Sequence, residues 1–206
     1  MGNVRLYGST SGYTELAPPA VAPDGVLSLP SGTGTIATQD YAAAAGGLVH
    51  IITTTFSAVS SVSLDNVFSS TYENYQVKLD FTGSVDATTD LRYRVGGVDN
   101  SDANSYKGQA LRGSSTSATA FSNSGNIGTS AVSDGGTLRS VCTVEVFDPA
   151  LAVTTFWMNT NRTRDDMIGI FTFRHTTATA FDGFTIIPAS GTITGTIRVY
   201  GYANGA

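Results

Sequence analysis

Two histidines, His50 and His175, and one cysteine, Cys142, have side chains suited to nucleophilic or general-base chemistry. Nucleophilic catalysis needs a base beside the nucleophile and a third group that orients the base. The two histidines lie far apart in the sequence, and the chain contains no Gly-x-Ser-x-Gly motif. Cys142 lies in an alternating run, residues 141–146, which predicts a small residue of the core. The sequence therefore predicts a non-enzymatic protein without catalytic residues.

Oxygen ligands for a metal ion gather in residues 99–104, Asp-Asn-Ser-Asp-Ala-Asn. A calcium loop has glycine at its sixth position and a bidentate glutamate at its end, and this segment has neither. It is interpreted as a turn rich in Asp and Asn, with a shallow calcium site as the alternative. One cysteine and two histidines cannot supply the three or four nitrogen or sulfur ligands of a zinc site. We expect neither a metal nor a cofactor.

Adjacent carboxylates at Asp165 and Asp166 are the nearest approach to the acid pair of a glycosidase. In an extended strand their side chains point to opposite faces, so they cannot flank one glycosidic bond. Residues 161–166 are better interpreted as a hairpin tip in which Arg162 and Arg164 screen the aspartates. Trp157 can stack on a sugar ring, but a single tryptophan is more typical of a core.

The composition is that of a β-rich domain with one core. The 206 residues are 41% hydrophobic and 13% charged, which is enough apolar material to fold without a metal or a disulfide. Gly, Ser and Thr are abundant and Lys is rare, so short strands and turns are favoured over helices. The formal net charge of −5, without a cationic stripe, argues against nucleic acid. No segment has the roughly 18 apolar residues of a membrane span, and the N-terminus lacks the features of a secretory signal.

Strand patterns fill the chain from residue 51 onward. Tyr75, Val77, Leu79 and Phe81 alternate with polar residues, which is the period of a strand wetted on one face. Such a strand must pack its apolar face on a second sheet. The predicted strands are 51–56, 60–64, 75–81, 91–95, 109–112, 141–147, 154–158, 168–174, 184–187 and 193–202. They predict an all-β fold in which residues 51–206 form a jelly-roll-like two-sheet β-sandwich.

The segment 113–136 is low in complexity and rich in Ser, Thr, Gly and Asn. Two interpretations fit this composition. The segment is either a long surface loop or a set of weakly paired strands at a sheet edge.

Residues 1–37 are the predicted extended arm, and they hold Pro18, Pro19, Pro23 and Pro30. Proline removes a ladder donor and fixes φ, so only short strands fit, near residues 13–16 and 26–29. An arm of this kind leaves several large side chains without an intramolecular core. We expect these side chains to form trimer or assembly contacts: Leu6, Tyr13, Leu16, Val26 and Leu29. Residues 38–50 are the predicted connector, with a short helix capped by Thr38 and ended by Gly46.

Two stretches of the arm carry an ordered set of short motifs. They read Gly8-Ser-Thr-Ser-Gly-Tyr-Thr-Glu-Leu-Ala-Pro-Pro-Ala-Val-Ala22 and Leu27-Ser-Leu-Pro-Ser-Gly-Thr-Gly-Thr-Ile-Ala-Thr38. This pattern resembles a module of tailed-phage tail fibres and other virion proteins. In fibres the module is part of an intertwined trimeric shaft, so the resemblance implies a homotrimer. A fibre normally has a virion-attachment domain before this module, whereas here only the first seven residues precede it.

Three further motifs lie in the predicted sandwich: Phe68-Ser-Ser-Thr-Tyr-Glu-Asn-Tyr75, Ala180-Phe-Asp-Gly-Phe-Thr-Ile186 and Ile193-Thr-Gly-Thr-Ile-Arg-Val-Tyr-Gly-Tyr202. Together they are similar to the C-terminal globular domains of phage virion-surface proteins. The resemblance implies a structural protein of the virion surface, made in the bacterial host cytoplasm.

Two roles remain open within that class. A homotrimeric capsid decoration, or cement, protein bound to the major capsid protein fits the short chain. A tail fibre that binds the host receptor, possible glycans included, fits the shaft-like module. A carbohydrate-binding or glycan-hydrolysing module is the alternative from a different class.

Overall fold

The chain divides into two units, Met1–Ala37 and Thr38–Ala206, in a computed structural model. The structure describes residues 4–7, 11–16, 47–133, 137–163 and 167–203. In the first unit the described residues form an antiparallel hairpin of β1 (Val4–Tyr7) and β2 (Tyr13–Leu16). Its register places Val4 opposite Leu16 and Tyr7 opposite Tyr13.

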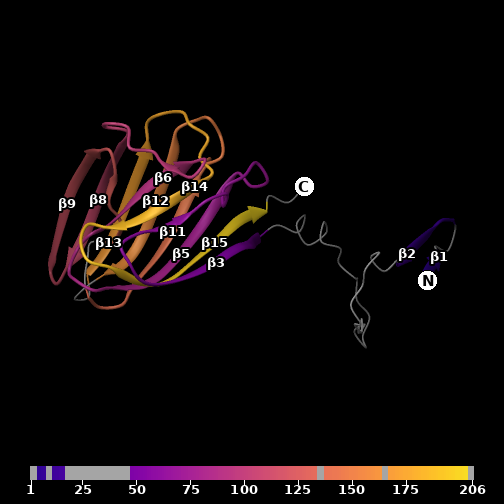
Figure 1. The fold of residues 1–206 in the computed structure, drawn as a ribbon, viewed down its shortest axis with the longest axis horizontal. Coiled ribbons are helices and arrows are strands. Elements are labelled where there is room, and N and C mark those ends of the chain that lie inside the picture. Colours follow the sequence, from indigo (N-terminus) through magenta and orange to yellow (C-terminus); the bar gives the residue numbers. More distant parts are fainter. Residues whose placement is uncertain (1–3, 8–10, 17–46, 134–136, 164–166, 204–206) are drawn as a thin grey trace. The chain divides into compact units, whose positions relative to one another are not determined.

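The larger of two sheets in the described part of the second unit has eight strands, in the order β3-β15-β5-β11-β12-β13-β8-β9. All neighbouring strands in this large sheet are antiparallel. β3 lies at one edge of the sheet and β9 at the other (Figure 1). The strands are β3 (Gly47–Val59), β5 (Asn74–Gly83), β8 (Tyr106–Ser114), β9 (Ser117–Gly125), β11 (Ser140–Phe147), β12 (Thr155–Thr163), β13 (Met167–His175) and β15 (Ile193–Ala203).

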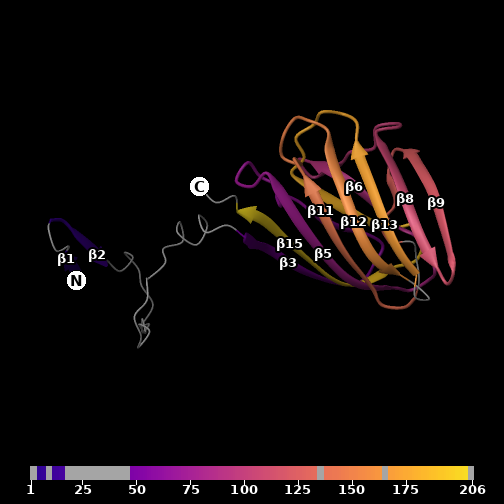
Figure 2. The same ribbon diagram turned by 180° about the vertical axis from the view of Figure 1, so that it is seen from behind.

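The small sheet has the order β10-β6-β14-β4, with β7 paired to β6. Its strands are β4 (Val62–Leu64), β6 (Thr89–Val95), β7 (Val98–Asp99), β10 (Gly128–Ser133) and β14 (Gly183–Pro188). The two views show the two sheets as layers (Figure 1, Figure 2). Along the chain, segments of the small sheet are interspersed with segments of the large one, as in a jelly roll. The predicted all-β sandwich is confirmed.

The core lies between the two sheets and follows from the period-2 pattern of their strands. On β5, Tyr75, Val77, Leu79 and Phe81 are all buried, whereas Lys78 between them is exposed. The small sheet covers this row with its own buried side chains: Leu91, Tyr93, Phe184 and Ile186. Each sheet therefore hides the apolar face of the other, which is the main source of stability.

A polar contact joins the two sheets inside the core. The carbonyl oxygen of Ala131 on β10 accepts a hydrogen bond from Trp157 Nε1 at 2.9 Å and another from Asn159 Nδ2. Both donors lie on β12 of the large sheet. A buried amide left without a partner would be costly, so this pairing fixes β10 against β12.

The ten strands predicted from residue 51 onward are all present, and so is the predicted strand 13–16. β3 begins at Gly47, earlier than the predicted start at Ile51, because Leu48 and His50 pair with Tyr202 and Tyr200 of the long last strand. Segment 113–136 contains edge strands β9 and β10, so the edge-strand interpretation holds and the long loop does not. β1 and β7 were not predicted. The predicted helix up to Gly46 and the predicted strand 26–29 lie outside the described residues.

At Gly183 the backbone of β14 lies very close to the backbone of β4. A Cβ atom at this position would overlap the carbonyl oxygen of Leu64, which belongs to the backbone and cannot turn away. We predict that Gly183→Ala lowers the free energy of unfolding in urea by about 1–3 kcal/mol, the usual effect of overpacking. Gly125→Ala is the control, because a Cβ atom there would come no closer than 3.7 Å to its nearest neighbour. Equal effects of the two substitutions would contradict the prediction.

Candidate functional surfaces

His175, one of the two candidate bases, is wholly buried at the end of β13. Its Nε2 lies 2.9 Å from Asn100 Oδ1, and its Nδ1 lies 3.3 Å from the carbonyl oxygen of Thr177. Three rings pack edge-on against it: Tyr93, Tyr106 and Phe181. Burial lowers the pKa of the imidazole, against an opposing effect of the Thr177 carbonyl. His175 therefore serves as a neutral hydrogen-bonding group of the core.

His50 and Cys142 also lack the partners that catalysis needs. His50 is exposed on β3, where its Nε2 lies 2.8 Å from Thr53 Oγ1 and its ring packs edge-on against Tyr200. Cys142 is buried on β11, and burial raises the pKa of its thiol. The prediction of a core cysteine is confirmed. Neither histidine contacts Cys142, and they lie on different strands, so the described residues bring none of these three groups together.

Trp157 belongs to the core, as its isolation in the sequence predicts. Its side chain is 1% exposed, and its Nε1 donates to Ala131 inside the sandwich. A buried ring offers no surface to a sugar. The aromatic platform that a glycan-binding module would need is therefore not supplied by Trp157.

The oxygen atoms of residues 99–104 are directed at protein partners. Asp99 Oδ1 accepts hydrogen bonds from Thr185 Oγ1 at 2.6 Å and from Arg94. Asn100 Nδ2 donates to Asp102 Oδ2 at 3.0 Å. Within the described residues, no group of three or more His, Cys, Asp or Glu side chains is placed to hold a metal ion. The interpretation of this segment as an Asx turn fits these contacts.

The predicted hairpin around residues 161–166 is present in its strands, since Thr163 of β12 lies opposite Met167 of β13. Arg164, Asp165 and Asp166 lie outside the described residues. The proposed screening of the two aspartates by Arg162 and Arg164 therefore stays a prediction.

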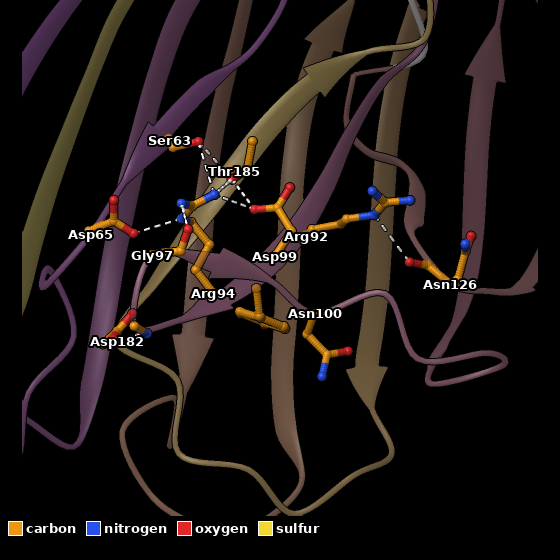
Figure 3. A network of polar contacts seen from close by, with 12 residues as sticks. Ser63, Asp65, Arg92, Arg94, Gly97, Asp99, Asn100, Asn126, Asp182 and Thr185 are labelled. Carbon is orange, nitrogen blue, oxygen red and sulfur yellow. Dashed lines mark hydrogen bonds and ion pairs between the residues drawn. The ribbon is translucent and has the colours of Figure 1, made fainter.

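Arg94 is the centre of the polar network on the outer side of the small sheet (Figure 3). Its Nε donates to Asp65 Oδ1 at 2.6 Å, and its Nη1 pairs with Asp99 and donates to Thr185 Oγ1 at 2.8 Å. Its Nη2 donates to the carbonyl oxygen of Gly97. The side chain is only 12% exposed, so water screens these contacts weakly.

The Arg94 network positions the loops at one end of the sandwich. Asp65 follows β4, Gly97 lies in the turn between β6 and β7, and Asp99 ends β7. In the same region Asp182 Oδ2 accepts a hydrogen bond from the backbone N–H of Gly96 at 2.6 Å (Figure 3). One planar guanidinium with several donors thus holds three segments that are far apart in the sequence. Each of its three nitrogens donates to an acceptor of the protein, which indicates a structural role.

The outer face of the large sheet carries an exposed apolar band, which we define as Leu111, Met158, Ile168 and Ile170. Ile170 lies directly opposite Leu111 across the β13–β8 pair, and these side chains are 55% and 51% exposed. Ile168 is 63% exposed. Large apolar side chains gathered on one face mark an interaction surface more often than single exposed ones do.

The sequence itself contains a signal for this exposed apolar band. In residues 167–173, Met-Ile-Gly-Ile-Phe-Thr-Phe, apolar side chains occupy both parities of the strand. A strand that is wetted on one face alternates, so this run indicates a strand with apolar side chains on both faces.

The predicted trimer contacts are placed only in part. Leu6 lies in β1, and Tyr13 and Leu16 are the two ends of β2. Val26 and Leu29 lie outside the described residues. The hairpin brings Leu6, Tyr13 and Leu16 into one element, and their contact with other copies stays a prediction.

Comparison with protein-family models finds no match to this sequence, and comparison with curated proteins finds none either. In the described part of the chain, no helix has the length and apolar character needed to cross a membrane.

The Arg94 network predicts that lysine cannot replace Arg94. A lysine ammonium is a point donor and cannot reach Asp65, Asp99 and Gly97 together. We expect Arg94→Lys to lower the free energy of unfolding by about 1–3 kcal/mol, the range for hydrogen bonds to charged groups. Arg92→Lys is the matched control, because Arg92 Nε makes one long bond of 3.3 Å to the Asn126 carbonyl. An effect of Arg92→Lys as large as that of Arg94→Lys would refute the central role of Arg94.

The environment of His175 predicts a pH dependence of stability. Its folded-state pKa lies below the ordinary 6.5, so the unfolded chain takes up this proton first as the pH falls. The contribution of neutral His175 to the free energy of unfolding is complete above about pH 6.5. It is lost toward lower pH, by at most about 1.4 kcal/mol per pH unit. Burial raises the pKa of Asp90, so protonation of Asp90 at lower pH favours the folded state and opposes the effect of His175. Unfolding is therefore measured between pH 7.5 and 5.5.

Two variants separate the histidines in that measurement. His175→Gln should flatten the pH profile, whereas His50→Gln should leave its slope unchanged. A profile that is equally steep in His175→Gln would exclude His175 as the titrating group.

Proposed function

We propose that this chain is a non-enzymatic structural protein of a phage particle, a homotrimeric capsid decoration protein exposed on the particle surface. In this role the N-terminal arm binds other copies and the capsid, and the sandwich is the exposed domain. The resemblance of residues 8–22 and 27–38 to a virion module and the all-β sandwich both support the proposal.

The observation that carries the proposal is the two-stranded hairpin of the first unit. Its strands have four residues each, and no third strand joins them among the described residues. A hairpin of this size is marginally stable in water, because it can neither cover an apolar face nor satisfy its outer edges. Copies of the same segment around a symmetry axis would supply the missing surfaces. Folding of the arm and assembly of the trimer are then one equilibrium.

The surroundings of the candidate catalytic groups support a role without catalysis. His175 is buried among aromatic rings, His50 has a threonine as its partner, and Cys142 is a buried thiol. The three nitrogens of Arg94 each donate to the protein itself.

A tail fibre is the second candidate, and the shaft-like character of the arm favours it. Both roles use the same trimer, but they differ in the number of copies on a particle. Quantitative mass spectrometry of purified particles against the major capsid protein separates them. A copy number comparable to that of the capsid protein supports decoration, and a small number restricted to tails supports a fibre.

A charged side chain in the arm tests assembly directly. We predict that Leu16→Asp converts the trimer to a monomer in sedimentation velocity, because an unpaired carboxylate cannot be buried between copies. Ser11→Asp is the control, since Ser11 is exposed in the hairpin turn. Far-UV circular dichroism should show an intact sandwich in both variants. A wild-type chain that sediments as a monomer at micromolar concentration would overturn the trimer.

A further inference from the structure

Two pairs of like charges face each other on the outer face of the large sheet. Lys78 lies directly opposite Arg198 across the β5–β15 pair, and Lys107 lies directly opposite Arg174 across the β8–β13 pair. Like charges in directly opposed positions destabilise a sheet. In the described residues, none of these four cations forms an ion pair with a carboxylate. Arg139 and, to a lesser degree, Arg198 lower the pKa of Asp80, so the attraction of Asp80 offsets part of the cost at Lys78 and Arg198. In the isolated chain the like-charge cost is therefore clearest at Lys107 and Arg174.

The two carboxylates on the same face are already held by other groups. Asp80 pairs with Arg139, and Glu145 accepts hydrogen bonds from Tyr202 Oη at 2.7 Å and Gln76 Nε2 at 2.8 Å. The outer face is thus cationic in a chain with a formal net charge of −5.

Each cation pair borders a groove. The apolar band lies on β12, β13 and β8, so it shares two strands with Lys107 and Arg174, and β11 separates it from Lys78 on β5. One groove, of ≈ 440 Å³, is lined by Lys107 and Arg174 together with Phe156. The other, of ≈ 520 Å³, is lined by Lys78 and Arg198. Exposed apolar side chains with charged groups at their border are the composition of a protein interface. The face therefore fits a protein surface with exposed apolar side chains and acidic groups.

One end of the same sandwich has this complementary composition. Four loops meet there, since backbone hydrogen bonds join Asp148 to Glu73, Phe181 to Pro149 and Asp182 to Arg94. We call this region, residues 65–73, 94–105, 148–154 and 176–182, the acidic end. Its carboxylates are Asp65, Glu73, Asp99, Asp102, Asp148 and Asp182. They are opposed by a single guanidinium, that of Arg94.

The acidic end also exposes apolar side chains between its carboxylates. Val98 in the β6–β7 turn is 69% exposed. Three further side chains of these loops are exposed to a lesser degree: Val95, Leu151 and Val153. The carboxylates of the acidic end are therefore complementary in charge to the cations of the outer face of the large sheet. Both surfaces also expose apolar side chains.

We propose that the acidic end of one sandwich binds the outer face of the large sheet of a second copy of this chain. The carboxylates would neutralise the two cation pairs, and the apolar side chains of both surfaces would be buried together. Two outer faces cannot meet each other, because their cation pairs would be opposed. The contact is therefore heterologous, with different surfaces of the two copies in contact, and three such contacts can close a ring. This contact rests on the homotrimer proposed above and deepens it, because it gives the packing of sandwiches whose arms already hold the copies together.

Carbodiimide coupling tests this contact well, because the chain has only two lysines, Lys78 and Lys107, and both lie on the outer face. The reagent joins an amine to a carboxylate that already touches it and adds no spacer. An equimolar mixture of ¹⁴N-labelled and ¹⁵N-labelled full chains distinguishes links between copies from links within one copy. We expect mixed-label links that join Lys78 or Lys107 to Asp102, Asp148 or another carboxylate of the acidic end. Their yield should fall at least tenfold between low salt and 0.5 M NaCl, since salt screens exposed charges.

Charge reversal supplies the matched variants. Lys107→Glu places an opposite charge beside Arg174, so it should leave the thermal midpoint unchanged or raise it while the mixed-label links are lost. Arg92→Glu, on the small sheet, should leave the links unchanged. The double variants K107E/R174E and D102K/D148K should each fail to associate alone and should form links when mixed.

Three results would overturn the proposal. One is a set of links confined to single copies at low salt. Another is a mixture of the two double variants that forms no links. The third is a cationic face that binds heparin but no second copy, which would assign it to an anionic polysaccharide. Mixed-label links that persist in Leu16→Asp would leave this contact standing and refute the arm as the source of the trimer.

Discussion

The rest of this structure depends on one requirement, that a β-sheet face with apolar side chains must be covered. Inside the sandwich the requirement is met, because the row Tyr75, Val77, Leu79 and Phe81 lies beneath the small sheet. The contact of the Ala131 carbonyl with Trp157 and Asn159 fixes how the two layers meet. Outside the sandwich the described residues do not meet this requirement. The apolar band of the large sheet is exposed, and among those residues no further strand pairs with the hairpin β1–β2.

These unmet surfaces, rather than a pocket with reactive groups, suggest what the protein does. The polar groups that are best connected, those around Arg94, are saturated with partners and hold loops in place. The loops at that end carry six of the ten carboxylates in the described part of the sandwich. Among the same described residues, Lys78, Lys107, Arg174 and Arg198 of the large sheet form no ion pair with a carboxylate. A molecule with two complementary surfaces and a hairpin of only two short strands is suited to assembly. Rigidity at the Arg94 network would keep the acidic surface in one shape before it meets a partner.

The sequence predicted those strands that have one face exposed to solvent and the other face buried. The alternation in residues 75–81 and 193–202 predicted β5 and β15, because apolar residues there mark the buried positions and polar residues mark most of the others. It was less decisive where this condition did not hold. The composition of residues 113–136, which contain β9 and β10, fits both a loop and edge strands, and the two-residue strand β7 was not predicted. The exposed band could have been recognised from β13, whose apolar residues occupy both faces. The opposed cations could not, since Lys78 and Arg198 are 120 positions apart and only the register of β5 and β15 brings them together.

The claim that the arm folds only against other copies is tested most directly by hydrogen exchange of the full chain over a range of concentrations. The account predicts that the backbone amides of β1 and β2 are protected when the chain is trimeric and lose their protection on dilution. The core amides of β5 and β11 should stay protected throughout. Protection of β1 and β2 that does not depend on concentration, or its absence at every concentration, would contradict the account.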